Sequence, residues 1–212
     1  MNPVKYFIKN IIIHFKYSIK GEQILSNKWK NRSKEDVEKY IDNVGELHRV
    51  WLINFFKDES SFLEIGCGWG PNLQLLRLNN KQSKIQGIDI SHASAEIGKK
   101  KGIPIICGDG LKTLSSFNDS SFDIVFTDMM LLYVDPKKIN TYVYEMIRIA
   151  KKSIYLLEFY DSHAVSKYTD DGWIHDYLNY CKEFSVTIIP IPDKFQKKGK
   201  WLKYAKLIKI EK

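Results

Sequence analysis

Three glycines at alternate positions, Gly66, Gly68 and Gly70, follow a short apolar run and precede a proline. The run 61–65 is typical of a buried strand, and Pro71 suits the first position of a helix because its missing N–H would be unpaired there anyway. Glycine permits positive φ and lets a ligand lie against the main chain, and a helix N-terminus offers unpaired N–H groups. The stretch therefore predicts a strand, a ligand-binding turn and a helix.

The spacing of these glycines excludes two common nucleotide-binding turns. A dinucleotide turn requires a third glycine where Pro71 stands, and a P-loop ends in Gly-Lys-Ser/Thr, which this stretch lacks. The pattern is instead acid-x-Gly-x-Gly-x-Gly, from Glu64 to Gly70. It resembles the first motif of class I S-adenosylmethionine-dependent methyltransferases. The alternative is a tight strand–helix turn in another kind of α/β protein.

Acidic residues follow the next two predicted strands. Asp89 lies near the end of the run 84–91 and 19 residues after Gly70, about the separation expected for an acid that binds ribose hydroxyls. The alternative role for Asp89 is to cap the next helix. Asp109 follows the run 103–107, and Gly108 to Leu111 resembles the family's next motif. That resemblance implies that Asp109 holds the adenine amino group and that Leu111 packs on the ring.

Two further buried strands are expected at 121–128 and 153–159, with a helix that begins at Asp135-Pro136. The Phe-Asp-x-Val-Phe pattern of the fourth strand resembles small-molecule and lipid methyltransferases of the class (methyltransferase type 11-like). Thr127-Asp128-Met129-Met130 stands where DNA and protein amide methyltransferases carry Asn/Asp-Pro-Pro-aromatic. Cytosine-C5 enzymes carry a Pro-Cys pair there. The sequence therefore favours the small-molecule branch.

The resemblance covers roughly residues 55–210. It implies an α/β fold: a Rossmann-like, seven-stranded, mostly parallel sheet with helices on both faces, ending in an antiparallel pair at 186–190 and 204–210. We expect a methyltransferase domain at 55–212 and an N-terminal helical extension at 1–54 that acts as a lid. Trp29 and Tyr40 either line its substrate side or are ordinary core aromatics. We also expect a helix that starts within the stretch 170–177 and runs to about 184. The lysines near the end recur every three residues, which predicts a β-bulge.

The implied cofactor is S-adenosyl-L-methionine. The resemblance and the turn geometry together assign to its binding Glu64, Gly66, Cys67, Gly68, Gly70, Asp89, Ile90, Asp109, Gly110, Leu111 and Thr127. His163, just past the fifth strand, is the candidate general base, since a neutral imidazole accepts a proton near pH 7; a surface-loop histidine is the alternative. No metal site is expected, because Asp128 and Glu158 alone do not make a carboxylate cluster.

The net charge of +8 is spread along the chain, and only four of the 33 basic residues are arginine. Arginine is the residue favoured for phosphate recognition, so a solvated lysine surface is preferred over nucleic-acid binding. The three cysteines lack paired spacing, so we expect no disulfide and no zinc site. We therefore expect the protein in a reducing compartment. We expect a cytoplasmic protein. The basic amphipathic segment 4–20 packs on the domain or a second copy; the alternative is peripheral contact with an anionic membrane.

The family's reaction is transfer of the sulfonium methyl group to an O, N or C nucleophile. The implied partner is a small-molecule or lipid-linked acceptor. Three alternatives stay open: a non-catalytic cofactor-binding or scaffold protein of the same fold, an RNA methyltransferase, and an NAD-dependent oxidoreductase, which Pro71 disfavours. The acceptor and the oligomeric state cannot be predicted from the sequence.

Overall fold

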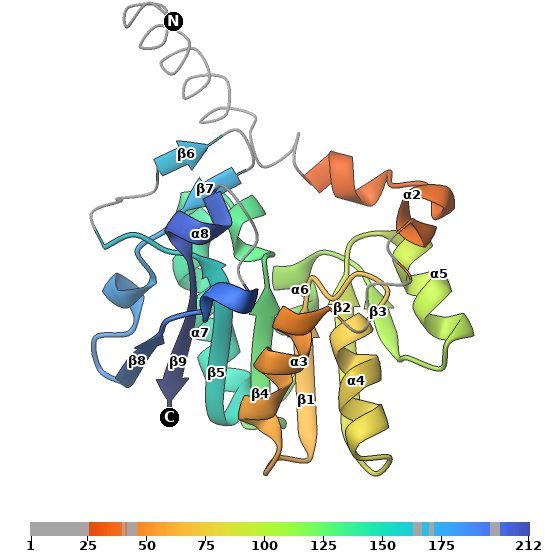
Figure 1. Ribbon diagram of the computed structural model, residues 1–212, viewed down its shortest axis with the longest axis horizontal. Coiled ribbons are helices and arrows are strands. Elements are labelled where there is room, and N and C mark those ends of the chain that lie inside the picture. The colour runs from red at the N-terminus through yellow and green to blue at the C-terminus, as the bar shows by residue number, and fades with distance from the viewer. Residues whose placement is uncertain (1–25, 40, 42–45, 163–166, 170–171, 196–199) are drawn as a thin grey trace, which may run out of the picture.

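The computed structural model describes residues 26–212 apart from 40, 42–45, 163–166, 170–171 and 196–199. A seven-stranded sheet lies at the centre of the described residues, with the strand order β3-β2-β1-β4-β5-β9-β8 (Figure 1). The first five strands pair in parallel, and β9 pairs antiparallel with β5 and β8. The sheet consists of β1 (Ser61–Ile65), β2 (Lys84–Asp89), β3 (Ile105–Cys107), β4 (Phe122–Asp128), β5 (Ala150–Phe159), β8 (Ser185–Ile189) and β9 (Ala205–Glu211). The predicted fold class is confirmed, including the antiparallel last pair.

Helices cover both faces of the sheet. Leu63 and Val125 belong to the core cluster under α7, whereas Phe62 and Phe126 belong to the cluster under α3 and α4, which lie in front of the sheet in Figure 1. Central parallel strands are apolar on both sides for this reason. The α-helices are α2 (Lys34–Glu38), α3 (Leu47–Ile53), α4 (Pro71–Asn79), α5 (His92–Lys100), α6 (Gly110–Leu114), α7 (Pro136–Ile149) and α8 (Lys200–Tyr204), with 3₁₀ turns η2 (Asn54–Phe56), η3 (Leu131–Tyr133), η4 (Tyr177–Tyr180) and η5 (Asp193–Phe195).

Helix starts coincide with capping residues. Ser33, Ser91 and Asp135 each accept a backbone N–H bond at the starts of α2, α5 and α7, as short polar side chains do at N-caps. Pro71 and Pro136 occupy the first turns of α4 and α7. The α4 start places the glycine turn directly at a helix N-terminus.

The prediction of a helix that starts within 170–177 and runs to about 184 is wrong. Gly172–Ile174 is instead strand β7, paired antiparallel with β6 (Lys167–Thr169), and η4 follows it. Trp173 and Ile174 are fully buried, and a short apolar run does not distinguish strand from helix by periodicity.

The predicted bulge is also wrong. Lys200 and Lys203 belong to α8, whereas Lys206 and Lys209 belong to β9. The pairing of β9 with β5 and β8 runs without a shift of register. The three-residue spacing therefore spans a change from helix to strand.

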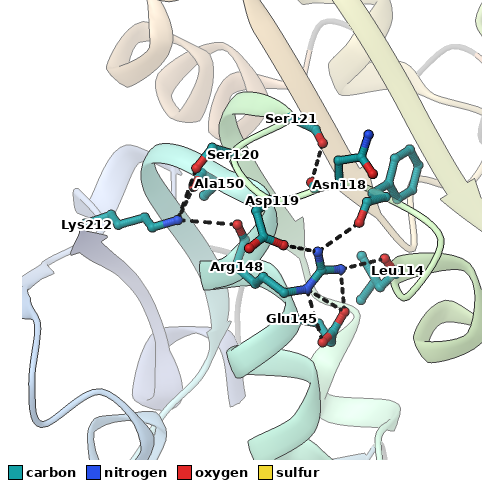
Figure 2. A network of polar contacts seen from close by, with 10 residues as sticks. Leu114, Asn118, Asp119, Ser120, Ser121, Glu145, Arg148, Ala150 and Lys212 are labelled. Carbon is teal, nitrogen blue, oxygen red and sulfur yellow. Dashed lines mark hydrogen bonds and ion pairs between the residues drawn. The ribbon is translucent and has the colours of Figure 1, made fainter.

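Arg148, near the end of α7, ties the loop before β4 to that helix (Figure 2). Its guanidinium donates to Phe117 O at 2.8 Å and Leu114 O at 3.2 Å. It also pairs with Asp119 at 2.6 Å and Glu145 at 2.7 Å. The network lies at the amino end of β4, so it is at the opposite end of the parallel strands from their carboxyl ends.

Three further expectations concern what the described residues lack. All three cysteines are free. The described residues include no group of three His, Cys, Asp or Glu side chains placed to hold a metal ion. No helix in the described part is long and apolar enough to cross a membrane. The segment 4–20 and Tyr40 lie outside the described residues.

Candidate functional site

A cavity of about 470 Å³ opens at the carboxyl ends of β1, β2 and β4. In the sheet, β2 and β3 lie on one side of β1, and β4 and β5 lie on the other. The point where the strand order reverses in this way is where open α/β sheets bind ligands. The volume falls in the range of small-molecule sites. The walls are the glycine turn, the ends of β2 and β4, the loop after β3 and five residues that precede β1: Ser26, Trp29, Arg32, Glu46 and Arg49.

The three glycines of the turn serve different purposes. All have positive φ: 71° at Gly66, 57° at Gly68 and 87° at Gly70. A Cβ at Gly66 would lie 2.1 Å from Met130 Cγ, and one at Gly70 would lie 2.7 Å from Ile103 Cγ2. A Cβ at Gly68 would meet nothing within 4 Å. Gly66 and Gly70 therefore permit tight packing, and Gly68 leaves the main chain open to the cavity.

Asp89, at the end of β2, braces this turn. Its Oδ2 accepts the Gly68 N–H at 2.7 Å, and its Oδ1 accepts the Ser91 N–H at 2.8 Å. Burial raises the pKa of Asp89 above its ordinary value, although these two bonds and the Arg32 charge oppose the shift. The helix cap itself is Ser91. Each carboxylate oxygen has room for a second donor, so Asp89 can brace Gly68 and still accept from a ligand in the cavity.

The remaining predicted cofactor residues divide into two groups. The structure brings Glu64, Gly66, Cys67, Gly68, Asp89, Ile90, Asp109 and Gly110 together around the cavity. Asp109 also caps α6 through a bond from the Lys112 N–H. Gly70, Leu111 and Thr127 are not part of the cavity lining. Gly70 packs against Ile103, Leu111 packs against the core, and Thr127 is fully buried within β4.

The acid that reaches the cavity from β4 is Asp128, next to the predicted Thr127. Asp128 Oδ2 accepts from Arg49 at 2.9 Å and from Asn72 Nδ2 at 3.1 Å, and His48 Nε2 lies 3.7 Å from the same oxygen. Burial opposes ionisation, but Arg49, His48 and Asn72 together hold the pKa of Asp128 well below its ordinary value. Asp128 is therefore a fixed anion.

Glu64 has the opposite character. It is 2% exposed and accepts a bond from Asn72 Nδ2 at 2.7 Å. Burial raises the pKa of Glu64 to about 8, although the Asn72 bond and the Arg49 charge oppose the shift. The carboxyl group is therefore largely protonated at neutral pH. Its Oε2 is buried at the cavity wall without a hydrogen-bond partner among the described residues.

Described residues of the N-terminal extension line the cavity, and its role as a lid stays a prediction. Trp29 is one of these lining residues, with its ring centroid 5.0 Å from that of Tyr133. The Arg32 guanidinium lies 5.1 Å from the Trp29 ring centroid. Helix α2 docks on α5 because Val37 packs in one cluster with Ala93 and Ile97 of α5, which also includes Trp69 of the glycine turn.

Sequence reasoning missed Arg49, Asn72 and Asp128. One signal was available: Asp128, like Asp89, is an acid at the carboxyl end of a buried strand. Arg49 and Asp128 lie 79 positions apart, and no local pattern announces their contact. The candidate general base, His163, lies outside the described residues and stays a prediction.

Comparison with known proteins adds a family. A sequence model of the family described as "Methionine biosynthesis protein MetW" matches residues 48–165, more than half of the chain. The chain belongs to the MetW family. The MetW match begins in α3 at His48 and ends past β5, so it includes the glycine turn, Asp89, Asp109 and Asp128.

Two curated relatives of this MetW-family chain are methyltransferases. Malonyl-[acyl-carrier protein] O-methyltransferase of Priestia megaterium is 34% identical over 98 residues, 42% of this chain and 35% of that protein. A tRNA (guanine-N(7)-)-methyltransferase of Christiangramia forsetii is 37% identical over 79 residues, 37% of this chain and 35% of that protein. The chain thus spans about a third of the length of each relative.

Solved structures share the fold across most of the chain. A SAM-dependent methyltransferase from Archaeoglobus fulgidus matches with a TM-score of 0.62 and 17% identity, covering 89% of this chain and 98% of that one. Geranyl diphosphate C-methyltransferase from Streptomyces coelicolor A3(2) matches with a TM-score of 0.63 and 11% identity, covering 90% and 97%. The fold is therefore that of class I S-adenosylmethionine-dependent methyltransferases.

Proposed function

We propose that this MetW-family protein is an S-adenosylmethionine-dependent methyltransferase that acts on a small-molecule or lipid-linked acceptor. The observation that carries the proposal is the open main chain at Gly68, which lines the cavity beside the acid that braces it, Asp89. In a turn that served packing alone, a side chain would lie against Gly68, as Met130 lies against Gly66 and Ile103 against Gly70. Methyltransferase relatives and fold support the same assignment.

The residues around the cavity fit this cofactor. Asp89 would accept from ribose hydroxyls, and Asp109, which is exposed, would accept from the adenine amino group. The main chain at Gly68 would lie along the methionine portion. The buried Oε2 of Glu64 is an orphan polar atom, and such atoms have a partner in the functional state of most proteins. The sulfonium supplies an activated methyl group, so the protein chiefly has to orient two reactants and exclude water.

One wall of the cavity is aromatic, and we assign it to the acceptor. Trp29 and Tyr133 line it with their ring centroids 5.0 Å apart, and the Arg32 guanidinium lies 5.1 Å from the Trp29 ring centroid. Aromatic walls with few polar groups suit a small organic acceptor. The two relatives are named for malonyl-[acyl-carrier protein] and for tRNA guanine, and the structural neighbour is named for geranyl diphosphate. We therefore rank acyl or isoprenoid acceptors first.

A non-catalytic partner role is the second candidate. One observation favours it: the family description names methionine biosynthesis and not methyl transfer. Such a protein would use the cavity to bind the cofactor and would present its surface to a partner. This partner role differs from the first candidate in one measurable property: no methyl group is transferred from the cofactor to an acceptor.

The experiment is an assay with methyl-tritiated S-adenosylmethionine. The purified protein is incubated in turn with malonyl-acyl-carrier protein, a prenyl diphosphate, small hydroxylated metabolites and tRNA. Label in an acyl or isoprenoid acceptor supports the proposal, and label only in tRNA replaces it with the RNA alternative. Binding of S-adenosylhomocysteine without label in any acceptor supports the partner role. The Arg148→Ala variant, altered far from the cavity, controls for preparation effects.

A further inference from the structure

The chain segment after β4 forms one wall of the cavity, and it is held in an unusual shape. Met129 has a φ of 57°, in the left-handed region that non-glycine residues seldom adopt. Its N–H still bonds to Leu157 O at 2.9 Å, which continues the pairing of β4 with β5. The chain then turns sharply into η3. Something outside the segment has to stabilise this turn.

The side chain that does so is Glu158, the penultimate residue of β5. Its Oε1 accepts the N–H groups of Met130 and Leu131, both at 2.9 Å. These are the first two residues after Met129, and Glu158 is 0% exposed. A buried carboxyl group thus satisfies two successive backbone donors that the turn has removed from any strand or helix.

The held segment faces the cavity through several side chains. Met130 packs so tightly over Gly66 that a Cβ there would lie 2.1 Å from its Cγ. Tyr133, one turn later, packs its ring against Trp29 of the N-terminal extension. The position of Glu158 therefore bears on the glycine turn and on the cover of the cavity.

We propose that Glu158 is a positioning residue: it fixes the segment Met129–Val134 so that Met130 seats the glycine turn and Tyr133 meets Trp29. Glu158 does not itself line the cavity; it contacts the wall only through the backbone N–H groups of Met130 and Leu131. Its effect on a ligand passes through the backbone of the segment. The part of the test that uses a cofactor rests on the function proposed above, and the part that follows backbone amides does not.

The surroundings of Glu158 define what can titrate beside it. Thr127 and Asp128 face it from β4, Tyr177 faces it from η4, and Lys206 is its register partner on β9. Burial raises the pKa of Glu158 to about 7, although the Leu131, Thr127 and Met130 groups oppose the shift. At the same segment, burial lowers the pKa of His175 to about 4, although bonds to the backbone of Leu131 and Val134 oppose this shift. A change near pH 7 in this segment thus points to Glu158 and not to His175.

A matched control exists at the opposite end of the same sheet. Asp123, at the start of β4, is also buried, and its Oδ2 accepts the N–H groups of Ser60 and Ser61 at 3.2 and 3.0 Å. Asp123→Leu and Glu158→Leu therefore each remove a carboxylate that accepts two successive backbone donors. Only Glu158→Leu removes one beside the cavity.

The first measurement is hydrogen exchange followed by mass spectrometry. In Glu158→Leu, the backbone amides of 129–134 should exchange at least about tenfold faster than in the parent chain. In Asp123→Leu, their exchange rates should stay as in the parent chain. The affinity for S-adenosylhomocysteine should fall about tenfold or more in Glu158→Leu and stay within about threefold in Glu158→Gln, which retains a carbonyl acceptor. Unchanged exchange in Glu158→Leu, or equal losses in Leu and Gln variants, would overturn the proposal.

A second measurement needs only the conservative variant, in case Glu158→Leu fails to fold. The chain has four methionines, so ¹⁵N-methionine labelling gives a simple spectrum. The Met130 amide should shift with pH near 7 in the parent chain and lose that step in Glu158→Gln, and the Met146 amide in α7 should show no such step. A Met130 amide that titrates alike in both proteins would refute the bond to Glu158. If no S-adenosylhomocysteine binds, the proposed function fails while these amides still decide the role of Glu158.

Discussion

The buried acid of the glycine-turn motif predicts an unusual dependence of stability on pH. Glu64 has a pKa of about 8 in the folded protein, raised by burial from an ordinary value of 4.5. Between these values the unfolded chain has lost the Glu64 proton and the folded chain still holds it. Stability therefore falls as pH rises from about 4.5 to about 8, because the folded state binds more protons there.

The Glu64→Gln variant isolates this effect. Glutamine resembles the protonated carboxyl group, and its carbonyl oxygen can still accept from Asn72. At about 1.4 kcal/mol for each unit of pKa, a rise from 4.5 to about 8 corresponds to roughly 5 kcal/mol of lost stability at high pH. The variant does not bear this cost.

The assay is urea denaturation of both proteins at several pH values from 5 to 9. The variant should gain several kcal/mol over the parent chain between the two ends of this range. Glu158, His175 and the other groups titrate in both proteins, so their contributions largely cancel in the difference. A difference in unfolding free energy that stays constant across the range would refute the assignment of Glu64 as a buried, neutral acid.

Three further substitutions test the rest of the site. Asp89→Ala should weaken S-adenosylhomocysteine binding by more than about tenfold in calorimetry, because charge-assisted bonds to the ribose and to the glycine turn are lost; an unchanged affinity would exclude the ribose role. Arg49→Ala should lower the unfolding free energy by about 3 kcal/mol, because Asp128 loses its main counter-charge while remaining buried; a neutral outcome would show that Asp128 does not depend on Arg49. Arg148→Ala should cost about 2 kcal/mol in the same denaturation experiment and leave cofactor affinity intact, since its partners lie at the other edge of the sheet; a loss of affinity would contradict that separation.

The place of the site was predictable because local patterns encode it. Three strand-forming runs are each followed by a residue of the site: the glycine turn after the first, Asp89 at the end of the second and Asp109 after the third. In a parallel sheet these positions all lie at the carboxyl ends of the strands, whatever the packing of the rest. The structure gathers them around one cavity. The spacing alone did not show that Gly66 and Gly70 serve packing and that only Gly68 stays open.

What could not be predicted depends on contacts distant in sequence. Arg49 reaches Asp128 from an element that sequence reasoning placed in a separate lid, and Glu158 holds backbone groups 27 and 28 positions away. The strand at Gly172–Ile174 forms only because β6 is available to pair with it. In each case the deciding partner is supplied by tertiary structure, which local propensity does not contain.

The proposed function depends most directly on the cofactor. The measurement that tests this dependence is calorimetric titration of the purified protein with S-adenosylhomocysteine, with NADH titrated in parallel. We expect one site per chain with roughly micromolar affinity for S-adenosylhomocysteine and no heat from NADH. Absence of binding to S-adenosylhomocysteine, or binding of NADH in its place, would contradict the proposed function. The open main chain at Gly68 would then not serve to bind this cofactor.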